Sequence, residues 1–138
     1  IIKKPLPVKQ SQSGEVRESR AVEPQEPEWI ELELARKHFE EKDAIFIDAR
    51  EVEEYQEGHI QDAVNVPYGW YWKEHPDLST LLPEGRVIII YCSGSDCEAS
   101  VQLAFAMFER GYSNLKIFFG GWEDWVNAGL PVQEGPQP

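Results

Sequence analysis

The apolar run "RVIIIYC" at residues 86–92 constrains the fold more than any other feature of the chain. Val87 and the isoleucines after it are β-branched, and no charged residue interrupts them. Such a run predicts a strand that is buried on both faces, as central strands of parallel sheets are. Helices are therefore expected on both sides of the sheet.

Strand and helix patterns alternate around this run. Further strands are predicted at 29–32, 44–50, 63–67 and 115–119, and helices at 34–41, 51–58, 101–111 and 120–129. The glycines that end two of these helices are typical stop signals. The alternation predicts an α/β domain with a parallel sheet and right-handed crossovers.

Length and composition indicate one domain with two tails. A chain of 138 residues with 41% hydrophobic content can build a single core, which we place at residues 26–133. Residues 1–25 are rich in Pro, Ser, Gln and charge, which predicts a disordered tether, and 134–138 are expected to be a disordered C-terminal end.

The N-terminal stretch "IIKKPLPVK" has two interpretations that we weigh equally. Its lysines resemble those that flank a membrane helix on the cytoplasmic side. The parent chain would then be anchored through a segment before residue 1, with this part in the cytoplasm. The other interpretation is an ordinary linker.

Charge and residue usage exclude several classes of partner and cofactor. A formal net charge of −12 disfavours nucleic acid, because its binding requires Lys and Arg to neutralise phosphates. It also disfavours long-range attraction of anionic substrates. The three histidines and two cysteines show no metal-ligand spacing, so neither a metal nor another cofactor is expected.

The candidate site is the sequence "CSGSDCEAS", which follows the apolar strand. Ligands of open α/β sheets bind beyond the carboxyl ends of the strands, and this places Cys92 in the crevice. Ser93, Gly94 and Ser95 are small, so their backbone N–H groups can converge on one point. Such a cradle would lower the pKa of the Cys92 thiol and make it a nucleophile. The alternative is a buried structural cysteine.

Two acids in this loop require an explanation. Ser95 and Glu98 match a capping box, which predicts a helix that begins near Asp96 and directs its positive dipole end at Cys92. Both acids also oppose a bound anion, and no Lys or Arg occurs from 87 to 109.

Three motifs, in this order, resemble the rhodanese-like domains. They are "FIDAREVEEYQEGHIQDAVNVP" at 46–67, "VIIIYC" at 87–92 and "GYSNLKIFFGGWEDWVNAGLPV" at 111–132. The resemblance implies a parallel five-stranded sheet with helices on both faces. It also implies a persulfide on Cys92 and sulfur transfer by thiolate attack and persulfide release.

The loop departs from the family's pattern in two ways. In many family members, and in phosphatase-like relatives, the loop ends in an Arg that helps to bind an anion, and no basic residue closes this one. Phosphatase activity is therefore not expected, nor is thiosulfate as the natural donor. The second departure is Cys97, which we expect in the first helical turn. It either resolves a Cys92 persulfide, shares the transferable sulfur, or is a small packing residue.

Asp48 and Arg50 match the family's Asp-x-Arg at the end of a neighbouring strand. We interpret them as a buried ion pair or hydrogen-bond network that supports the loop. Arg50 is also the only nearby candidate cation for a substrate.

Two functions remain open. The first is a sulfurtransferase that moves sulfane sulfur from a small-molecule or protein persulfide to a thiol acceptor through Cys92, with Cys97 as the resolving thiol. The second is a non-catalytic rhodanese-like module that binds a partner or senses redox state. The position of the nucleophile and the second cysteine favour the enzyme, whereas the acidic loop favours the module.

Overall fold

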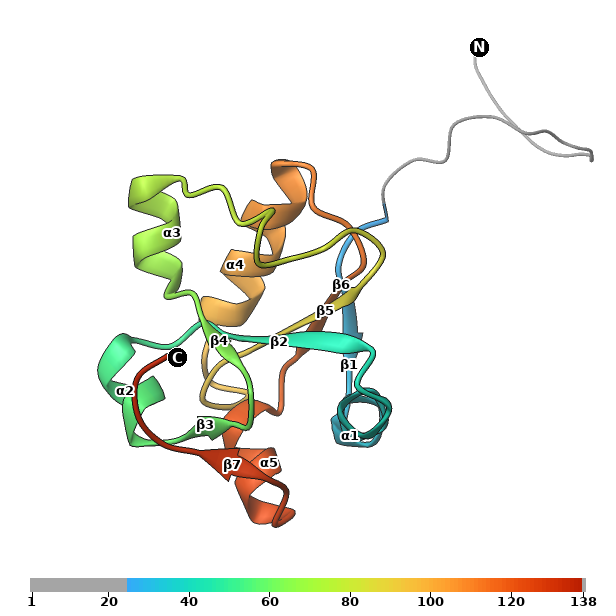
Figure 1. Ribbon diagram of the computed structural model, residues 1–138, viewed down its shortest axis with the longest axis vertical. Helices are drawn as coiled ribbons and strands as arrows, with labels where there is room; N and C mark the ends of the chain where they lie inside the picture. Colours follow the sequence, from blue (N-terminus) through green and yellow to red (C-terminus); the bar gives the residue numbers. More distant parts are fainter. Residues whose placement is uncertain (1–24, 138) are drawn as a thin grey trace, which may run out of the picture.

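The computed structural model describes residues 25–137 of the chain (Figure 1). The predicted tether at 1–25 therefore lies outside the described residues, except for its last position. The elements in chain order are β1 (Glu28–Ile30), α1 (Leu32–Glu41), β2 (Ala44–Asp48), α2 (Val52–Glu57), β3 (His59–Ile60), β4 (Val64–Asn65), α3 (Tyr68–Glu74), β5 (Val87–Tyr91), α4 (Ala99–Glu109), β6 (Leu115–Phe118), α5 (Gly121–Asn127) and β7 (Val132–Gln133).

Five strands form one parallel sheet in the order β1-β6-β5-β2-β4. The predicted α/β fold with a parallel five-stranded sheet is confirmed. The apolar strand β5 lies at its centre, because it pairs with β2 on one side and with β6 on the other. A separate antiparallel pair joins β3 to β7. The sequence patterns do not predict this pair, since two-residue strands are too short to show alternation.

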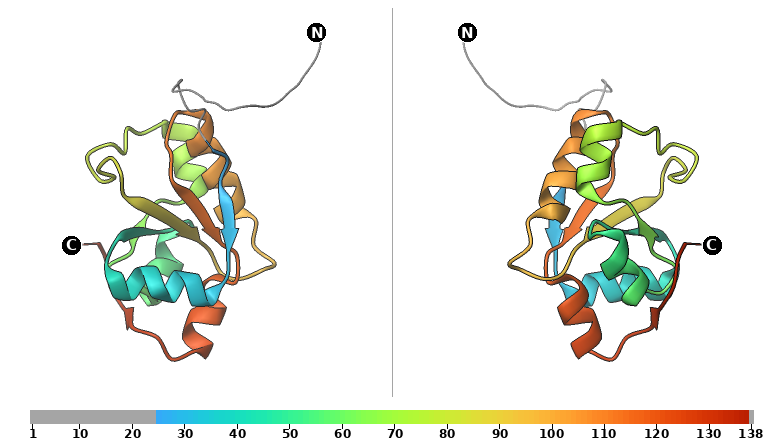
Figure 2. Two further views of the ribbon diagram at one scale, coloured as in Figure 1. Left: turned by 90° about the vertical axis from the view of Figure 1, so that its right-hand side faces the viewer. Right: turned by 90° about the vertical axis from the view of Figure 1, so that its left-hand side faces the viewer.

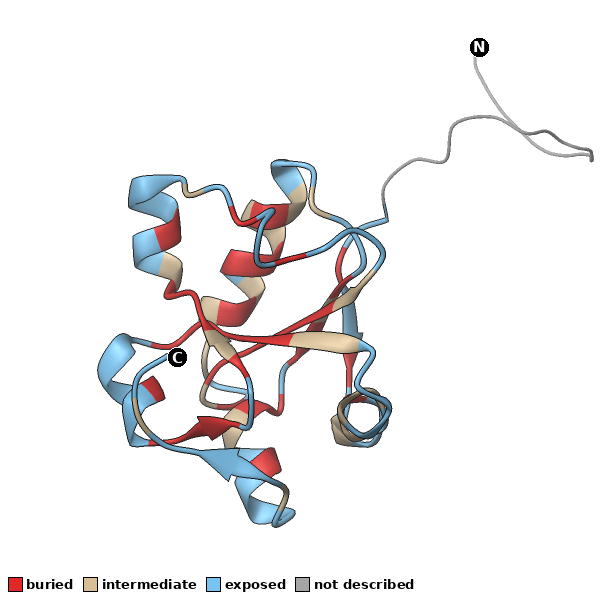
Figure 3. Cartoon of the chain, viewed as in Figure 1, coloured by how far each residue is buried: buried red, intermediate tan, exposed pale blue. Residues whose placement is uncertain are grey.

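Helices cover both faces of the sheet (Figure 2). Alternate residues of β5 serve the two cores: Ile88 and Ile90 pack with residues of α3 and α4, whereas Ile89 and Tyr91 pack with residues of α1, α2 and α5. Figure 3 shows the buried residues running along the central strands. None of the helices in residues 25–137 is both long and apolar enough to span a bilayer.

The C-terminal end is held against the domain, contrary to the prediction of disorder from residue 134. The N–H of Gly135 donates to the carbonyl oxygen of Gln56 at 2.8 Å. The side-chain amide of Gln137 accepts from the N–H of Asn65 at 3.0 Å and donates to its carbonyl oxygen at 3.3 Å. One amide side chain thus occupies the open edge of β4 as a neighbouring strand would.

Candidate active site at the carboxyl end of the central strand

Cys92 is the first residue after β5, and it is buried, with only 2% of its surface exposed to solvent. The parallel register continues to this point, because the N–H of Ala49 donates to the carbonyl oxygen of Tyr91 at 2.8 Å. The cysteine therefore lies at the carboxyl end of the central strand, where open α/β sheets bind ligands. This is the place that the sequence predicts for it.

The start of α5 holds the backbone that leaves β5. The N–H of Trp122 donates to the carbonyl oxygen of Cys92 at 2.8 Å, and the N–H of Glu123 donates to that of Ser93 at 2.9 Å. Gly121 makes this close approach possible, since its φ is +60° and an added Cβ would overlap the Cys92 carbonyl oxygen. The glycine of the "GGW" sequence thereby fixes the path of the active-site loop.

The loop after Cys92 is longer than predicted. Helix α4 begins at Ala99 with Glu98 as its N-cap, and no side chain caps it. The capping box with Ser95 as N-cap is therefore wrong, and Cys97 precedes the helix rather than lying in its first turn. The physical reason is a turn in which the N–H of Cys97 donates to the carbonyl oxygen of Gly94 at 3.0 Å. This turn, together with the disulfide described next, holds residues 94–97 back toward the strand.

A disulfide joins Cys92 to Cys97. Their Cα atoms lie 6.2 Å apart, within the usual span of such bridges. The two residues differ in their surroundings, because Cys92 is buried and Cys97 is partly exposed. The spacing of the two cysteines left a local bridge and a reactive pair open as alternatives. The structure brings the two sulfurs together, which is compatible with both.

Ser100 contacts the sulfur of Cys92 from the first turn of α4. Its Oγ lies 3.4 Å from the Cys92 Sγ, and the serine is fully buried. A sulfur in a disulfide has no proton, so the Ser100 hydroxyl is the donor in this contact. Sequence reasoning missed this residue, because no local motif links a serine in a helix to a cysteine before the loop.

The loop that carries the bridge contains free backbone donors and acidic side chains. Within residues 25–137, the N–H groups of Ser93, Gly94, Ser95 and Asp96 have no hydrogen-bond acceptor. Asp96 and Glu98 belong to the same loop and are exposed. The carboxylate of Glu123 faces the loop, and a Cβ added at Gly94 would come within 2.8 Å of its Oε1. The loop therefore offers amide donors but no side-chain cation.

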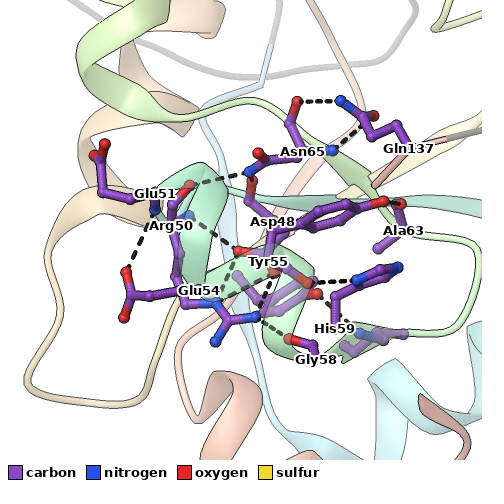
Figure 4. Close-up of polar contacts among 12 residues, drawn as sticks. Asp48, Arg50, Glu51, Glu54, Tyr55, Gly58, His59, Ala63, Asn65 and Gln137 are labelled. Atoms are coloured by element: carbon purple, nitrogen blue, oxygen red, sulfur yellow. Dashed lines mark hydrogen bonds and ion pairs between the residues drawn. The ribbon is translucent and has the colours of Figure 1, made fainter. Parts of the chain in front are cut away.

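Asp48 and Arg50 form a buried ion pair at the end of β2 (Figure 4). The Nε of Arg50 donates to Asp48 Oδ1 at 3.0 Å, and one terminal nitrogen donates to Asp48 Oδ2 at 2.7 Å and to the carbonyl oxygen of Gly58 at 2.6 Å. The guanidinium also lies 4.9 Å from the ring centroid of Trp122. The pair thus supports the same α5 start that holds the Cys92 backbone.

Burial and charge shift the pKa values of this network. Burial lowers the pKa of Arg50, but the hydrogen bonds and charge of Asp48 outweigh it, so that the pKa is raised and the guanidinium stays charged. The pKa of Tyr91 is raised well above 10.0, mainly by burial and then by the charge of Asp48. The Tyr91 hydroxyl accepts a hydrogen bond from the N–H of Ile60 at 3.0 Å.

No cluster of His, Cys, Asp or Glu side chains in residues 25–137 is arranged to hold a metal ion.

Residues 31–128 match the family described as Rhodanese-like domain. The chain belongs to this family. Among curated relatives, the HTH-type transcriptional regulator Rv0324 of Mycobacterium tuberculosis is 35% identical over 103 residues, which cover 75% of this chain and 43% of that protein. The tRNA uridine(34) hydroxylase of Photorhabdus laumondii is 26% identical over 113 residues, which cover 77% of this chain and 31% of that protein. The thiosulfate:glutathione sulfurtransferase of Saccharomyces cerevisiae is 30% identical, with 62% of this chain and 66% of that protein covered. The chain thus spans less than two thirds of each of these relatives.

Two solved structures share the fold. A protein from Bacillus halodurans, BH2092, superposes with a TM-score of 0.67 at 23% identity, over 78% of this chain and 77% of that one. The thiosulfate sulfurtransferase of Pseudomonas aeruginosa gives a TM-score of 0.66 at 22% identity, over 79% of this chain and 20% of that one. Among the curated relatives named above, a sulfurtransferase stands beside a hydroxylase and a regulator.

The absence of a closing arginine distinguishes the loop of this rhodanese-like domain. Arg50 was the candidate cation for a substrate, but its side chain is only 5% exposed and is bound to Asp48 and Gly58. The structure therefore corrects that interpretation: Arg50 is a supporting residue behind the loop. The side-chain donor that contacts the Cys92 sulfur is therefore the Ser100 hydroxyl and not a guanidinium.

Proposed function

We propose that this rhodanese-like domain is a sulfurtransferase that carries sulfane sulfur as a persulfide on Cys92, with Cys97 as the resolving thiol. The observation that carries the proposal is the contact between Cys92 Sγ and the Ser100 hydroxyl at the carboxyl end of β5. A hydroxyl that donates to sulfur favours the thiolate, which is the nucleophilic form. The kinship with the yeast thiosulfate:glutathione sulfurtransferase supports the reaction class.

The reaction begins with the reduced site. The Cys92 thiolate attacks the outer sulfur of a persulfide RSSH, so that Cys92–SSH forms and the thiolate RS⁻ leaves. An acceptor thiolate then attacks the outer sulfur of Cys92–SSH and leaves as a new persulfide, which returns the Cys92 thiolate. The Ser100 hydroxyl contacts the sulfur, and the N–H groups of residues 93–96 are free donors in the same loop, so both can stabilise an anionic sulfur in each state.

Cys97 provides a second fate for the persulfide. Its thiolate attacks the inner sulfur of Cys92–SSH, which releases HS⁻ and forms the Cys92–Cys97 disulfide. The Cα separation of 6.2 Å allows this step without movement of the strand. The domain then requires two thiols to return to the reduced state.

The donor we propose is a small-molecule or protein persulfide rather than thiosulfate. Asp96, Glu98 and Glu123 repel a dianion near the loop, and no arginine compensates for them. A persulfide attached to a neutral or basic carrier avoids this repulsion.

Turnover with two donors tests the proposal. The reduced protein is given cysteamine persulfide, whose carrier is cationic, or thiosulfate, with cyanide as acceptor, and thiocyanate is measured for the wild type, Cys92→Ser and Cys97→Ser. After subtraction of the rate without protein, we expect thiocyanate from the wild type and Cys97→Ser with the persulfide, little with thiosulfate, and none from Cys92→Ser. Sulfide release in the absence of cyanide should require both cysteines. Activity that persists in Cys92→Ser would refute the proposal.

A second candidate function is a binding or redox-sensing module without turnover. The disulfide in the loop and the kinship with an HTH-type transcriptional regulator favour it. Complete inactivity with both donors, together with reversible formation of the bridge, is the result that this alternative predicts.

A further inference from the structure

The two sulfurs of the bridge differ in their access to solvent. Cys92 is 2% exposed, the start of α5 binds its carbonyl group, and the fully buried Ser100 contacts its Sγ. Cys97 is partly exposed and lies between the exposed residues Asp96 and Glu98. A thiol that approaches from solution therefore reaches the sulfur of Cys97 first.

The two directions of attack also differ in the sulfur that they expel. The rate of thiol–disulfide exchange increases with access to the attacked sulfur and with the stability of the leaving thiolate. Attack on Cys97 expels the sulfur of Cys92, which accepts a hydrogen bond from Ser100 at 3.4 Å. Attack on Cys92 would expel the sulfur of Cys97, which lies between the acids Asp96 and Glu98 in the chain. Access and leaving-group stability thus favour the same direction.

We propose that Cys97 is the site at which an external thiol opens the bridge and becomes attached, with Cys92 released as the thiolate. A thiolate RS⁻ attacks Cys97 Sγ, the Cys92–Cys97 bond breaks, and the products are Cys97–S–S–R and Cys92–S⁻. A second RS⁻ attacks the sulfur of R, which yields RSSR and the Cys97 thiolate. The two electrons that reduce the bridge come from the two thiols. This exchange involves no sulfane sulfur, so it does not depend on the proposed sulfur transfer.

The surrounding charges identify the class of thiol. Asp96 and Glu98 precede and follow the attacked Cys97 in the chain and are exposed, and no Lys or Arg occurs between residues 87 and 109. An anionic thiol is repelled by these carboxylates, whereas a neutral or cationic one is not. The difference should shrink as salt is added, because the carboxylates are exposed. Thiols with neutral or cationic carriers are therefore the preferred reductants.

Mapping of the first adduct tests the proposal directly. The full chain is oxidised, loss of both free thiols is verified, and about one equivalent of cysteamine is added. Samples are quenched in acid at successive times and alkylated. The cysteines share the tryptic peptide 87–110, because no Lys or Arg lies between Arg86 and Arg110, so fragmentation of that peptide locates the adduct. Extrapolation of the adduct ratio to zero time removes the contribution of later exchange between the two sulfurs.

We expect the zero-time adduct on Cys97 to exceed that on Cys92 roughly tenfold or more. An adduct that forms mainly on Cys92, or equally on Cys92 and Cys97, would overturn the proposal. Protein that still has two free thiols after oxidation would also overturn it, because no bridge would then exist. Cysteamine should open the bridge several-fold faster than mercaptoethanesulfonate at low salt, after correction for the pKa of each thiol. Equal corrected rates would remove the claim on the class of thiol.

Ser100→Ala provides the test of the leaving group, and Ser113→Ala is its matched control. Both changes remove one serine hydroxyl, but Ser100 contacts the Cys92 sulfur, whereas Ser113 is exposed and lies outside the active-site loop. We expect Ser100→Ala to slow opening by about threefold or more and Ser113→Ala to leave it unchanged. Equal rates in both variants would contradict the role given to Ser100. These measurements use no sulfur donor, so their failure is distinct from a failure of the persulfide assay, which uses reduced protein.

Discussion

Gly121 connects the stability of the fold to the path of the active-site loop, and its replacement by alanine tests that connection. An alanine there must adopt a φ of +60°, which costs roughly 1–2 kcal/mol. Its Cβ would also overlap the Cys92 carbonyl oxygen and lie 3.2 Å from the Gly94 nitrogen. Both neighbours are backbone atoms, so neither can rotate away as a side chain would.

The overlap adds a second cost to the first. The Cys92 carbonyl oxygen accepts the N–H of Trp122 at 2.8 Å, and displacement of the carbonyl would leave that donor without a partner. A buried donor that loses its partner costs about 1–3 kcal/mol. The total loss for Gly121→Ala is therefore about 2–5 kcal/mol of unfolding free energy. Sulfur transfer should also decrease, because the Cys92 backbone shifts.

Gly129→Ala is the matched control for this change. Gly129 has a φ of +72°, but an added Cβ would meet no atom within 4 Å. It should therefore lose only the backbone contribution of roughly 1–2 kcal/mol. Urea unfolding followed by tryptophan fluorescence gives both values. If the two variants lose the same free energy, the close approach of Gly121 to the Cys92 carbonyl contributes nothing and the reasoning is refuted.

Three further predictions concern the residues behind and beside Cys92. Asp48→Asn removes the partner of the buried Arg50 and should cost about 3–5 kcal/mol in urea unfolding. The raised pKa of Tyr91 stabilises the fold below a pH of about 10, where the phenol is neutral in both states. That stabilisation is lost as the pH rises further, because the unfolded chain releases its proton first. Tyr91→Phe should therefore reduce the decline of unfolding free energy in alkaline solution. Ser100→Ala should raise the thiol pKa of Cys92, as measured by the ultraviolet absorbance of the thiolate in a Cys97→Ser background.

Each of these predictions has a result that would contradict it. For Asp48→Asn, the control is Glu28→Gln, which breaks the exposed pair with Lys116 and should cost only about 0–1 kcal/mol; equal losses would show that burial of the first pair is unimportant. An unchanged alkaline slope in Tyr91→Phe would show that the phenol does not couple to folding. An unchanged thiol pKa in Ser100→Ala would leave the hydroxyl without a role at the sulfur.

The fold could be predicted from the sequence because its signals are local. The continuous apolar run of β5 predicts burial on both faces, and Ile88 and Ile89 do pack against opposite layers of helices. The stop signals at Gly58 and Gly111 lie at the ends of α2 and α4. Such patterns depend only on residues that are close together in the chain.

The detailed loop could not be predicted, because contacts between distant residues decide it. The sequence of Ser95 and Glu98 is that of a capping box, yet α4 begins only at Ala99. A disulfide and a turn at Cys97 outweigh the local capping preference. In the same way, the hydrogen bond from Trp122 to the Cys92 carbonyl joins segments whose proximity only the assembled sheet creates.

The most direct test of the central claim is the intact mass of reduced protein after exposure to a persulfide donor. The claim is that Cys92 itself carries the sulfur. Cys97→Ser cannot resolve a persulfide through the bridge, so we predict that it accumulates a species heavier by one sulfur atom, which fragmentation assigns to Cys92. Cys92→Ser should show no such species. Protein that gains no sulfur, or a sulfur adduct that persists in Cys92→Ser, would contradict the account.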